Sequence, residues 1–61
     1  MVRAIVPAYN ESERITGVVR SLRGVVDEVV VIDDGSTDDT AIRARAAGAI
    51  VLVHSVNMGQ G

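Results

Sequence analysis

The sequence predicts an α/β fold in which three strands alternate with two helices and form a parallel sheet. Three short apolar runs rich in valine and isoleucine, at residues 2–6, 29–32 and 49–53, have the composition of strands. The two segments between them have helical spacing or are rich in alanine, and each has a helix-start pattern and a closing glycine. Right-handed crossovers between such strands give the sheet order 3-2-1, the first half of a doubly wound fold.

The first strand and the first helix come at the start of the chain. The strand at residues 2–6 is expected to stop at Pro7, because proline cannot donate a hydrogen bond to a central ladder. Asn10 stands three residues before a glutamate, the spacing of a capping box, and Gly24 is placed to end the helix in the left-handed conformation. We therefore expect a helix over about 11–23, with one apolar face made of Ile15, Val18, Val19 and Leu22.

The remaining three elements follow in the same way. Four consecutive β-branched residues at 29–32 indicate a strand that is covered on both faces, as parallel strands are. Ser36 stands three residues before an aspartate and repeats the capping-box spacing, and Gly48 closes the alanine-rich helix expected at 40–47. The third strand is expected at 49–53.

Composition limits the classes of protein to which the chain can belong. The 61 residues include no cysteine, so neither a disulfide nor a thiolate metal site stabilises the domain. The net charge is −2 and the arginines are not clustered, which argues against nucleic-acid binding. The apolar runs are far shorter than the ~20 residues of a membrane span, and we expect a cytoplasmic protein. A domain of this size buries only about 60% of its unfolded surface, so we expect a fragment or an oligomer.

Polar residues gather where the three strands end. Because the strands are parallel, the loops at 7–12, 33–39 and 54–61 lie along one edge of the sheet, where ligands bind in open α/β folds. The adjacent carboxylates Asp33 and Asp34 suit the imide or amino protons of a base, ribose hydroxyls or a divalent cation. The other residues of these loops that packing does not require are Tyr9, Asn10, Glu11, Asn57, Gly59 and Gly61.

Known phosphate-binding motifs do not occur in the sequence. Neither G-x-G-x-x-G after the first strand nor G-x-x-x-x-G-K-[ST] is found, which argues against a dinucleotide site or a P-loop. Asp33 and Asp34 are adjacent, whereas an aspartate-nucleophile phosphatase needs acids separated by one residue. We interpret Asp38 and Asp39 as charges that favour a helix start, and His54 as structural, because no second ligand stands at metal spacing.

Several of these residues belong to motifs of a known family. The chain resembles the amino-terminal part of the family 2 inverting glycosyltransferases of the GT-A fold in IVPAYNE at 5–11, VIDDGSTD at 31–38 and NMGQG at 57–61. Within the family, the pattern is most similar to polyprenyl-phosphate or dolichol-phosphate sugar synthases. The resemblance implies a three-layer Rossmann-like fold, of which residues 1–61 are a truncated nucleotide-binding half-domain.

The resemblance also implies roles for single residues in nucleotide binding. Asp34 would accept a hydrogen bond from an imide N–H of the base, Glu11 would reach the ribose, and Asp33 would orient the turn. Gln60 stands where the family commonly has lysine. The residues implied to line the base pocket are Pro7, Ala8 and Tyr9, and those that match the family's N-x-G-K-G loop are Asn57, Gly59 and Gly61.

The implied activity is transfer of a sugar from a UDP- or GDP-linked donor to an acceptor, with a polyprenyl phosphate at the cytoplasmic face of a membrane as one candidate. The family's D-x-D motif, which binds Mg²⁺ or Mn²⁺ together with the diphosphate, does not occur in the chain, and neither does its acidic general base. We therefore expect that the isolated chain binds nucleotide without turnover. It should contain no catalytic residue, metal ligand or cofactor of its own.

The alternative comes from another class of protein: a self-associating structural fragment without a ligand. In the order 3-2-1 the first strand is an edge, and a valine-rich edge invites pairing with a second copy. We therefore expect a homodimer that extends the sheet or exchanges an element. A dimer that covers residues 7–11 would favour this alternative over nucleotide binding.

Overall fold

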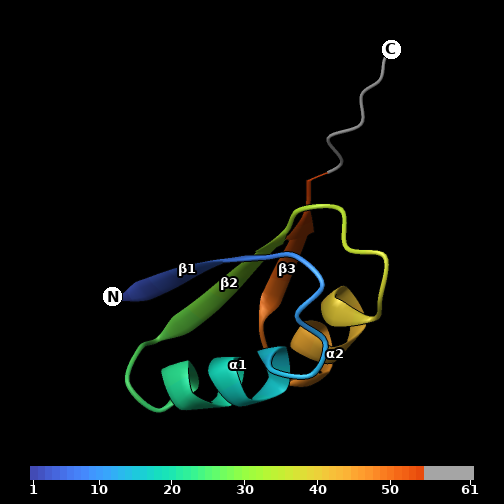
Figure 1. The fold of residues 1–61 in the computed structure, drawn as a ribbon. Helices are drawn as coiled ribbons and strands as arrows, with labels where there is room; N and C mark the ends of the chain where they lie inside the picture. Colours follow the sequence, from blue (N-terminus) through green and yellow to red (C-terminus); the bar gives the residue numbers. More distant parts are fainter. Residues whose placement is uncertain (55–61) are drawn as a thin grey trace.

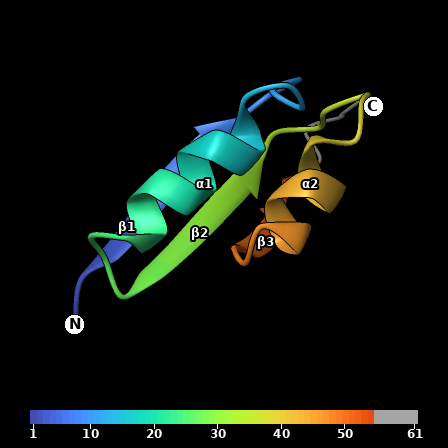
Figure 2. The same cartoon turned by 90° about the horizontal axis from the view of Figure 1, so that it is seen from below.

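The computed structural model describes residues 1–54. Three strands form one parallel sheet in the order β1-β2-β3 (Figure 1). Both helices lie on the same face of the sheet and contact each other (Figure 2). The elements are β1 Arg3–Ala8, α1 Ile15–Arg23, β2 Glu28–Asp33, α2 Thr40–Ala46 and β3 Ile50–Val53. The predicted α/β class, element order and parallel sheet are confirmed, and the described residues form two of the three expected layers.

The core lies between the sheet and the two helices. On β2, Val29 and Val31 are on the helix side and are 2% and 0% exposed. Ile15 and Val19, one turn apart on α1, belong to the same buried cluster, and α2 contributes the small side chain of Ala44. Burial of these aliphatic side chains, worth roughly 25 cal/mol per Å², fixes the helices on this face. The loops that follow the strands are positioned as a result.

β1 continues through Pro7 to Ala8, beyond its predicted end. The Val2 carbonyl accepts hydrogen bonds from the N–H groups of residues 27 and 28, at the start of β2. The Ala8 carbonyl accepts one from the N–H of Asp34, just after β2. Because alternate residues of a strand face the same neighbour, the nitrogen of Pro7 faces the outer edge of β1, where no ladder N–H is needed. The prediction that Pro7 ends the strand is therefore wrong, and the reason is that β1 is an edge strand of the described sheet.

Neither helix has the predicted side-chain cap. The helices begin at Ile15 and Thr40, and their N-cap residues make no side-chain cap hydrogen bond. Asn10 lies well before the start of α1 and has a φ of 50°, in the left-handed region. Asn10 and Ser36 bond instead to each other's loops, as described below. Both capping-box predictions are wrong for this reason.

The two helix-ending glycines differ from each other. Gly24 has a φ of −77°, so the predicted left-handed conformation at the end of α1 is wrong. Gly48 follows the end of α2, as predicted, and has a φ of 107°; a Cβ added there would collide with the Arg23 side chain. Neither helix of residues 1–54 has the length and apolar character needed to cross a membrane.

The face of the sheet opposite the helices is apolar in the two rows nearest the carboxyl-end edge, beyond the Arg3–Glu28 pair. The strand register aligns one row of side chains, Ile5, Val30 and Ile50, and a second row, Pro7, Ile32 and Leu52. Ile5, Ile50 and Leu52 are 55%, 47% and 54% exposed, whereas the central Val30 is 7% exposed between its row neighbours. We call these six residues the open face. Within residues 1–54, β2 is thus covered on this side by neighbouring strands rather than by a helix.

Candidate functional site

The carboxyl ends of the three strands meet at one edge of the sheet, as predicted (Figure 1). The Asp34 N–H donates a hydrogen bond to the Ala8 carbonyl at 2.9 Å, and the His54 N–H donates to the Asp33 carbonyl at 2.7 Å. These two bonds continue the ladder just beyond the strands. They hold the beginnings of the three loops at a fixed spacing.

Asp33, the last residue of β2, is directed into the protein. It is only 4% exposed, and its Oδ1 accepts hydrogen bonds from the Ser36 N–H at 3.2 Å and from the Ser36 hydroxyl. Gly35 completes the turn with a φ of 77°, a conformation that glycine adopts without steric cost. The Asp33 carboxylate is therefore satisfied inside the turn, and a direct contact with a ligand stays a prediction.

Asp34 lies on the opposite side of the extended chain from Asp33 and is exposed. Its side chain is 55% exposed, and its Oδ1 lies 3.4 Å from Nδ1 of His54. His54 therefore lies beside the carboxylate that the family motif associates with base recognition. The interpretation of His54 as a purely structural residue did not include this contact. An accessible carboxylate at this edge can accept a hydrogen bond from a ligand N–H or O–H.

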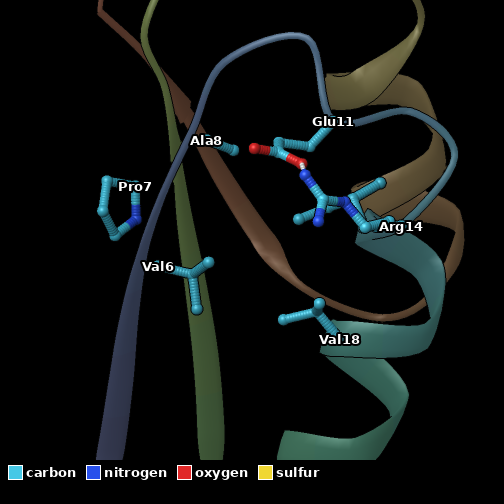
Figure 3. Close-up of a pocket in the computed structure, with 7 residues that line it drawn as sticks. Val6, Pro7, Ala8, Glu11, Arg14 and Val18 are labelled. Atoms are coloured by element: carbon cyan, nitrogen blue, oxygen red, sulfur yellow. Dashed lines mark ion pairs between the residues drawn. The ribbon is translucent and has the colours of Figure 1, made fainter.

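A groove of about 260 Å³ lies between β1 and the start of α1 (Figure 3). Val6 and Val18 face each other across it, and Glu11 and Arg14 lie at one end. The Glu11 Oε1 and the Arg14 Nη2 form an ion pair at 3.0 Å. The residues that line the groove are Val6, Pro7, Ala8, Glu11, Arg14, Ile15 and Val18. Three of the predicted site residues therefore share one groove, while Tyr9 is 56% exposed and does not line it.

Asn10 joins the loop after β1 to the loop after β2. Its N–H donates to Oγ of Ser36 at 2.8 Å, and its Oδ1 accepts from the Thr37 N–H at 2.8 Å and the Thr37 hydroxyl at 3.3 Å. The left-handed backbone that permits this arrangement is one that asparagine adopts more readily than most residues. The backbone N–H and the side chain of this one residue thus link it to residues 26 and 27 positions further along the sequence.

Thr40 and Asp38 form a second link between the same loops. Thr40 is 0% exposed, and its Oγ1 accepts from the Glu11 N–H at 2.9 Å while its hydroxyl donates to Oδ1 of Asp38. The Asp38 carboxylate also accepts from the Thr40 N–H at 3.0 Å and from the Ser12 N–H at 3.3 Å. The Thr40 hydroxyl bond lowers the pKa of Asp38 below its ordinary value, because it favours the charged form.

We call these contacts between residues 10–12 and 36–40 the loop clasp. Asp38 therefore does more than place a charge at a helix start: it bonds to the other loop. Asp39, the N-cap residue of α2, instead forms an ion pair with Arg43 at 3.0 Å, one turn along the helix.

Sequence reasoning assigned no site role to Thr40 or Arg14. The available signal was the run of hydroxyl and carboxylate residues at 36–40, which exceeds what one helix cap requires. The predicted site residues Asn57, Gly59 and Gly61 lie outside the described residues.

The described residues do not fit a metal ion. Within residues 1–54, no group of three or more histidine, aspartate or glutamate side chains is placed to hold one. Asp33 is bonded to Ser36, and Asp34 is on the other side of the chain, so the adjacent acids do not make a chelate.

Curated relatives of the chain are sugar-transferring enzymes. The glucosyl-3-phosphoglycerate synthase of Mycolicibacterium smegmatis is 49% identical over 55 residues, which cover 84% of this chain and 18% of the relative. The synthase of the same name from Mycobacterium tuberculosis (strain ATCC 25618 / H37Rv) is 47% identical, with 84% of this chain and 17% of the relative covered. The chain thus spans less than a fifth of the length of these relatives. The predicted similarity to dolichol-phosphate synthases is not confirmed by them.

Solved structures of the Mycobacterium tuberculosis synthase have the same fold over the matched part. One is a complex with Mn²⁺, UDP and glucosyl-3-phosphoglycerate, and another is a complex with Mn²⁺, UDP-glucose and phosphoglyceric acid. Each matches with a TM-score of 0.77 and 45% identity and covers 84% of this chain and 20% of that chain. The pattern of the family described as Glycosyl transferase family 2 matches residues 4–61. The predicted resemblance is therefore confirmed, and the chain belongs to glycosyl transferase family 2.

Proposed function

We propose that the chain is the nucleotide-binding portion of a glycosyltransferase that transfers glucose from UDP-glucose to a phosphoglycerate-type acceptor. The observation that carries this proposal is the exposed Asp34 carboxylate at the shared carboxyl-end edge. It occurs in a chain that, over the matched residues, is 45% identical to a synthase crystallised with UDP. These relatives favour UDP over GDP as the donor nucleotide, and they favour phosphoglycerate over a polyprenyl phosphate as the acceptor.

Asp34 is the residue that we propose recognises the base. Uracil presents an imide N–H at N3, and a carboxylate is a strong acceptor for it because charge-assisted hydrogen bonds are roughly twice as strong as neutral ones. Nδ1 of His54 lies 3.4 Å from the Asp34 carboxylate, so the two side chains can contact the same ligand. Asp33 is proposed to act indirectly, because its hydrogen bonds to Ser36 hold the turn that contains Asp34.

Glu11 is the residue that we propose binds the ribose. Its carboxylate can accept from two hydroxyls of one ring, and its ion pair with Arg14 at 3.0 Å balances its charge. That balance matters because a UDP-sugar brings a diphosphate, which unpaired carboxylates would repel. Pro7, Ala8 and Tyr9 are proposed to line the base.

The diphosphate and the chemical step are proposed to depend on other residues. Backbone amides around Asn57, Gly59 and Gly61 are suited to an anion, in keeping with the family's loop. Because the described residues do not fit a metal ion, we assign no metal contact to them. In the longer enzyme an acceptor oxygen attacks the anomeric carbon and UDP departs. The residues of this chain bind and orient the nucleotide, and the isolated chain is expected to have no turnover.

A calorimetric titration with UDP and CDP tests this proposal. Cytosine has no imide N–H at N3, so the chain should bind UDP more tightly than CDP. Replacing Asp34→Ala removes a bond to a charged group worth about 1.5–3 kcal/mol, so UDP binding should weaken about tenfold or more. The same variant should lose the preference for UDP over CDP.

The matched control is Asp39→Ala, which removes another half-exposed carboxylate and should leave UDP affinity unchanged. Equal affinities for UDP and CDP in the parent chain, unaltered by Asp34→Ala, would contradict base recognition by Asp34.

The second candidate function, self-association, is favoured by the composition of β3. All four residues of β3 are apolar, and Ile50, Leu52 and Val53 are 47%, 54% and 60% exposed. The other edge, β1, carries Arg3 and Pro7, which discourage pairing. We infer that a second copy of the chain would pair along β3 rather than along the predicted β1 edge. Sedimentation equilibrium should then show that the parent chain is a dimer and that Leu52→Lys is a monomer. A parent chain that is monomeric at high concentration would exclude self-association.

A further inference from the structure

The loop clasp contains more polar contacts than folding of the two helices requires. α1 and α2 already contact each other and the sheet through apolar side chains. The clasp is instead confined to residues 10–12 and 36–40, beside the groove that Glu11 lines and the turn that presents Asp34. We propose that Asn10 and Asp38 are positioning residues for nucleotide binding, because they hold the Glu11 loop in register with the Asp34 turn.

The Asn10 half of the clasp fixes the loops through two oppositely directed bonds. The Asn10 N–H donates to Ser36 Oγ, and its side-chain Oδ1 accepts from the Thr37 N–H, both at 2.8 Å. Ser36 is also the residue that bonds to the buried Asp33 carboxylate. The loop after β1 is therefore tied to the turn at Ser36, which directly follows Asp34 and Gly35 in the chain.

The Asp38 half of the clasp acts through Thr40. The hydroxyl hydrogen of Thr40 is directed to the Asp38 carboxylate, so the lone pairs of Oγ1 are left to accept the Glu11 N–H at 2.9 Å. Asp38 meanwhile accepts directly from the next amide, Ser12. The backbone of Glu11 is thereby held, while its carboxylate stays at the groove with Arg14.

This arrangement predicts an effect on affinity that a purely structural role would not have. Affinity falls in proportion to the fraction of molecules in which the two loops are already in the binding arrangement. If loss of one half of the clasp lowers that fraction to about a tenth, UDP binding weakens about tenfold in protein that is still folded. The proposal rests on the proposed nucleotide-binding function.

The test compares the 61-residue parent chain with two Asn10 variants and one control variant. Asn10→Gly keeps a left-handed backbone accessible but removes Oδ1, whereas Asn10→Asp keeps an acceptor oxygen at the same position. UDP affinity is measured by calorimetry at a temperature where circular dichroism shows every variant folded. Amide hydrogen exchange is measured on the same samples without UDP.

We expect Asn10→Gly to bind UDP about tenfold more weakly, and Asn10→Asp to restore most of the affinity. In Asn10→Gly, exchange should accelerate at the Thr37 and Thr40 amides of the other loop. Glu28→Gln, which breaks the 2.7 Å pair with Arg3 at the opposite end of the sheet, is the control and should change neither readout. If Asn10→Gly does not fold, Asp38→Asn is measured in its place, with the Glu11 and Ser12 amides as exchange reporters.

Three outcomes would overturn the proposal, and they are distinguishable. Unchanged exchange in the other loop would show that the clasp does not couple the loops. Faster exchange with parental UDP affinity would show that the clasp serves the fold alone. A parent chain that binds no UDP would overturn the proposed function itself, and the positioning role with it.

Discussion

The carboxyl-end edge of the sheet and its open face differ in how fully residues 1–54 satisfy or cover their side chains. At the edge, two buried polar side chains have hydrogen-bond partners: Asp33 bonds to Ser36 within its own turn, and Thr40 bonds to Asp38 and to the Glu11 N–H of the other loop. On the open face, Ile5, Ile50 and Leu52 are each about half exposed. The contrast indicates that residues 1–54 satisfy the buried polar groups of the carboxyl-end edge with their own contacts, while the open face has the character of a surface that another layer would cover.

The largest effect on stability is expected from Thr40→Val. This change keeps the shape of a fully buried side chain but removes the acceptor of the Glu11 N–H and the donor to Asp38. Leaving such groups without partners costs about 1–3 kcal/mol. Thermal unfolding should show a clear loss of stability for Thr40→Val and a smaller loss for Thr40→Ser, which keeps the hydroxyl. Equal stabilities of Thr40→Val and the parent would show that the edge is not held by the clasp.

A smaller effect, dependent on pH, is expected from Asp38→Asn. The Thr40 hydroxyl bond lowers the pKa of Asp38 below its ordinary value of 3.8. A carboxylate whose pKa is lowered by folding contributes stability that is fully present above the unfolded value and is lost as the pH falls through the folded value. The melting temperatures of the parent and Asp38→Asn should therefore differ by a constant amount above about pH 5 and converge below pH 3.8. A difference that persists at low pH would contradict an electrostatic origin.

The smallest effect is expected on the open face. Leu52→Thr keeps a residue suited to a strand and removes apolar surface at a side chain that is 54% exposed. Substitutions at such sites usually change stability by no more than about 0.5 kcal/mol. Chemical denaturation at low protein concentration measures this change without a contribution from self-association. A loss as large as that of Thr40→Val would show that the open face is already packed.

Much of the fold could be predicted from the sequence because its signals are local. The helical spacing from Ile15 to Leu22 and the β-branched run at 29–32 each fall inside one element and require no knowledge of the partners. Gly48 was also predictable, since a glycine directly after an alanine-rich helix commonly takes a left-handed conformation. The edge position of β1 followed from the order of strands and crossovers.

The features that were not predicted depend on partners distant in the sequence. Asn10 has the spacing of a helix cap, but its bonds go to Ser36 and Thr37, in the other loop. Pro7 stays in β1 because its nitrogen faces the outer edge of the sheet. This could not be predicted without knowing which residues of β1 direct their N–H groups toward β2. Gly24 is right-handed, and nothing in the structure explains why glycine stands there. Of the site, the Asp34 position was predictable from its place directly after a buried strand together with the family motif. Its contact with His54 became visible only from the register of β2 and β3.

We infer that the carboxyl-end edge is a preformed nucleotide half-site, and that the row of the open face formed by Ile5, Val30 and Ile50 lies outside it. An amide chemical-shift map of the ¹⁵N-labelled 61-residue chain, titrated with UDP, tests this claim most directly. A nucleotide half-site at this edge should give shifts concentrated in residues 8–12 and 33–38 and at His54, with little change at Ile5, Val30 and Ile50. Shifts centred on the open face, or none at millimolar UDP in a folded sample, would contradict it.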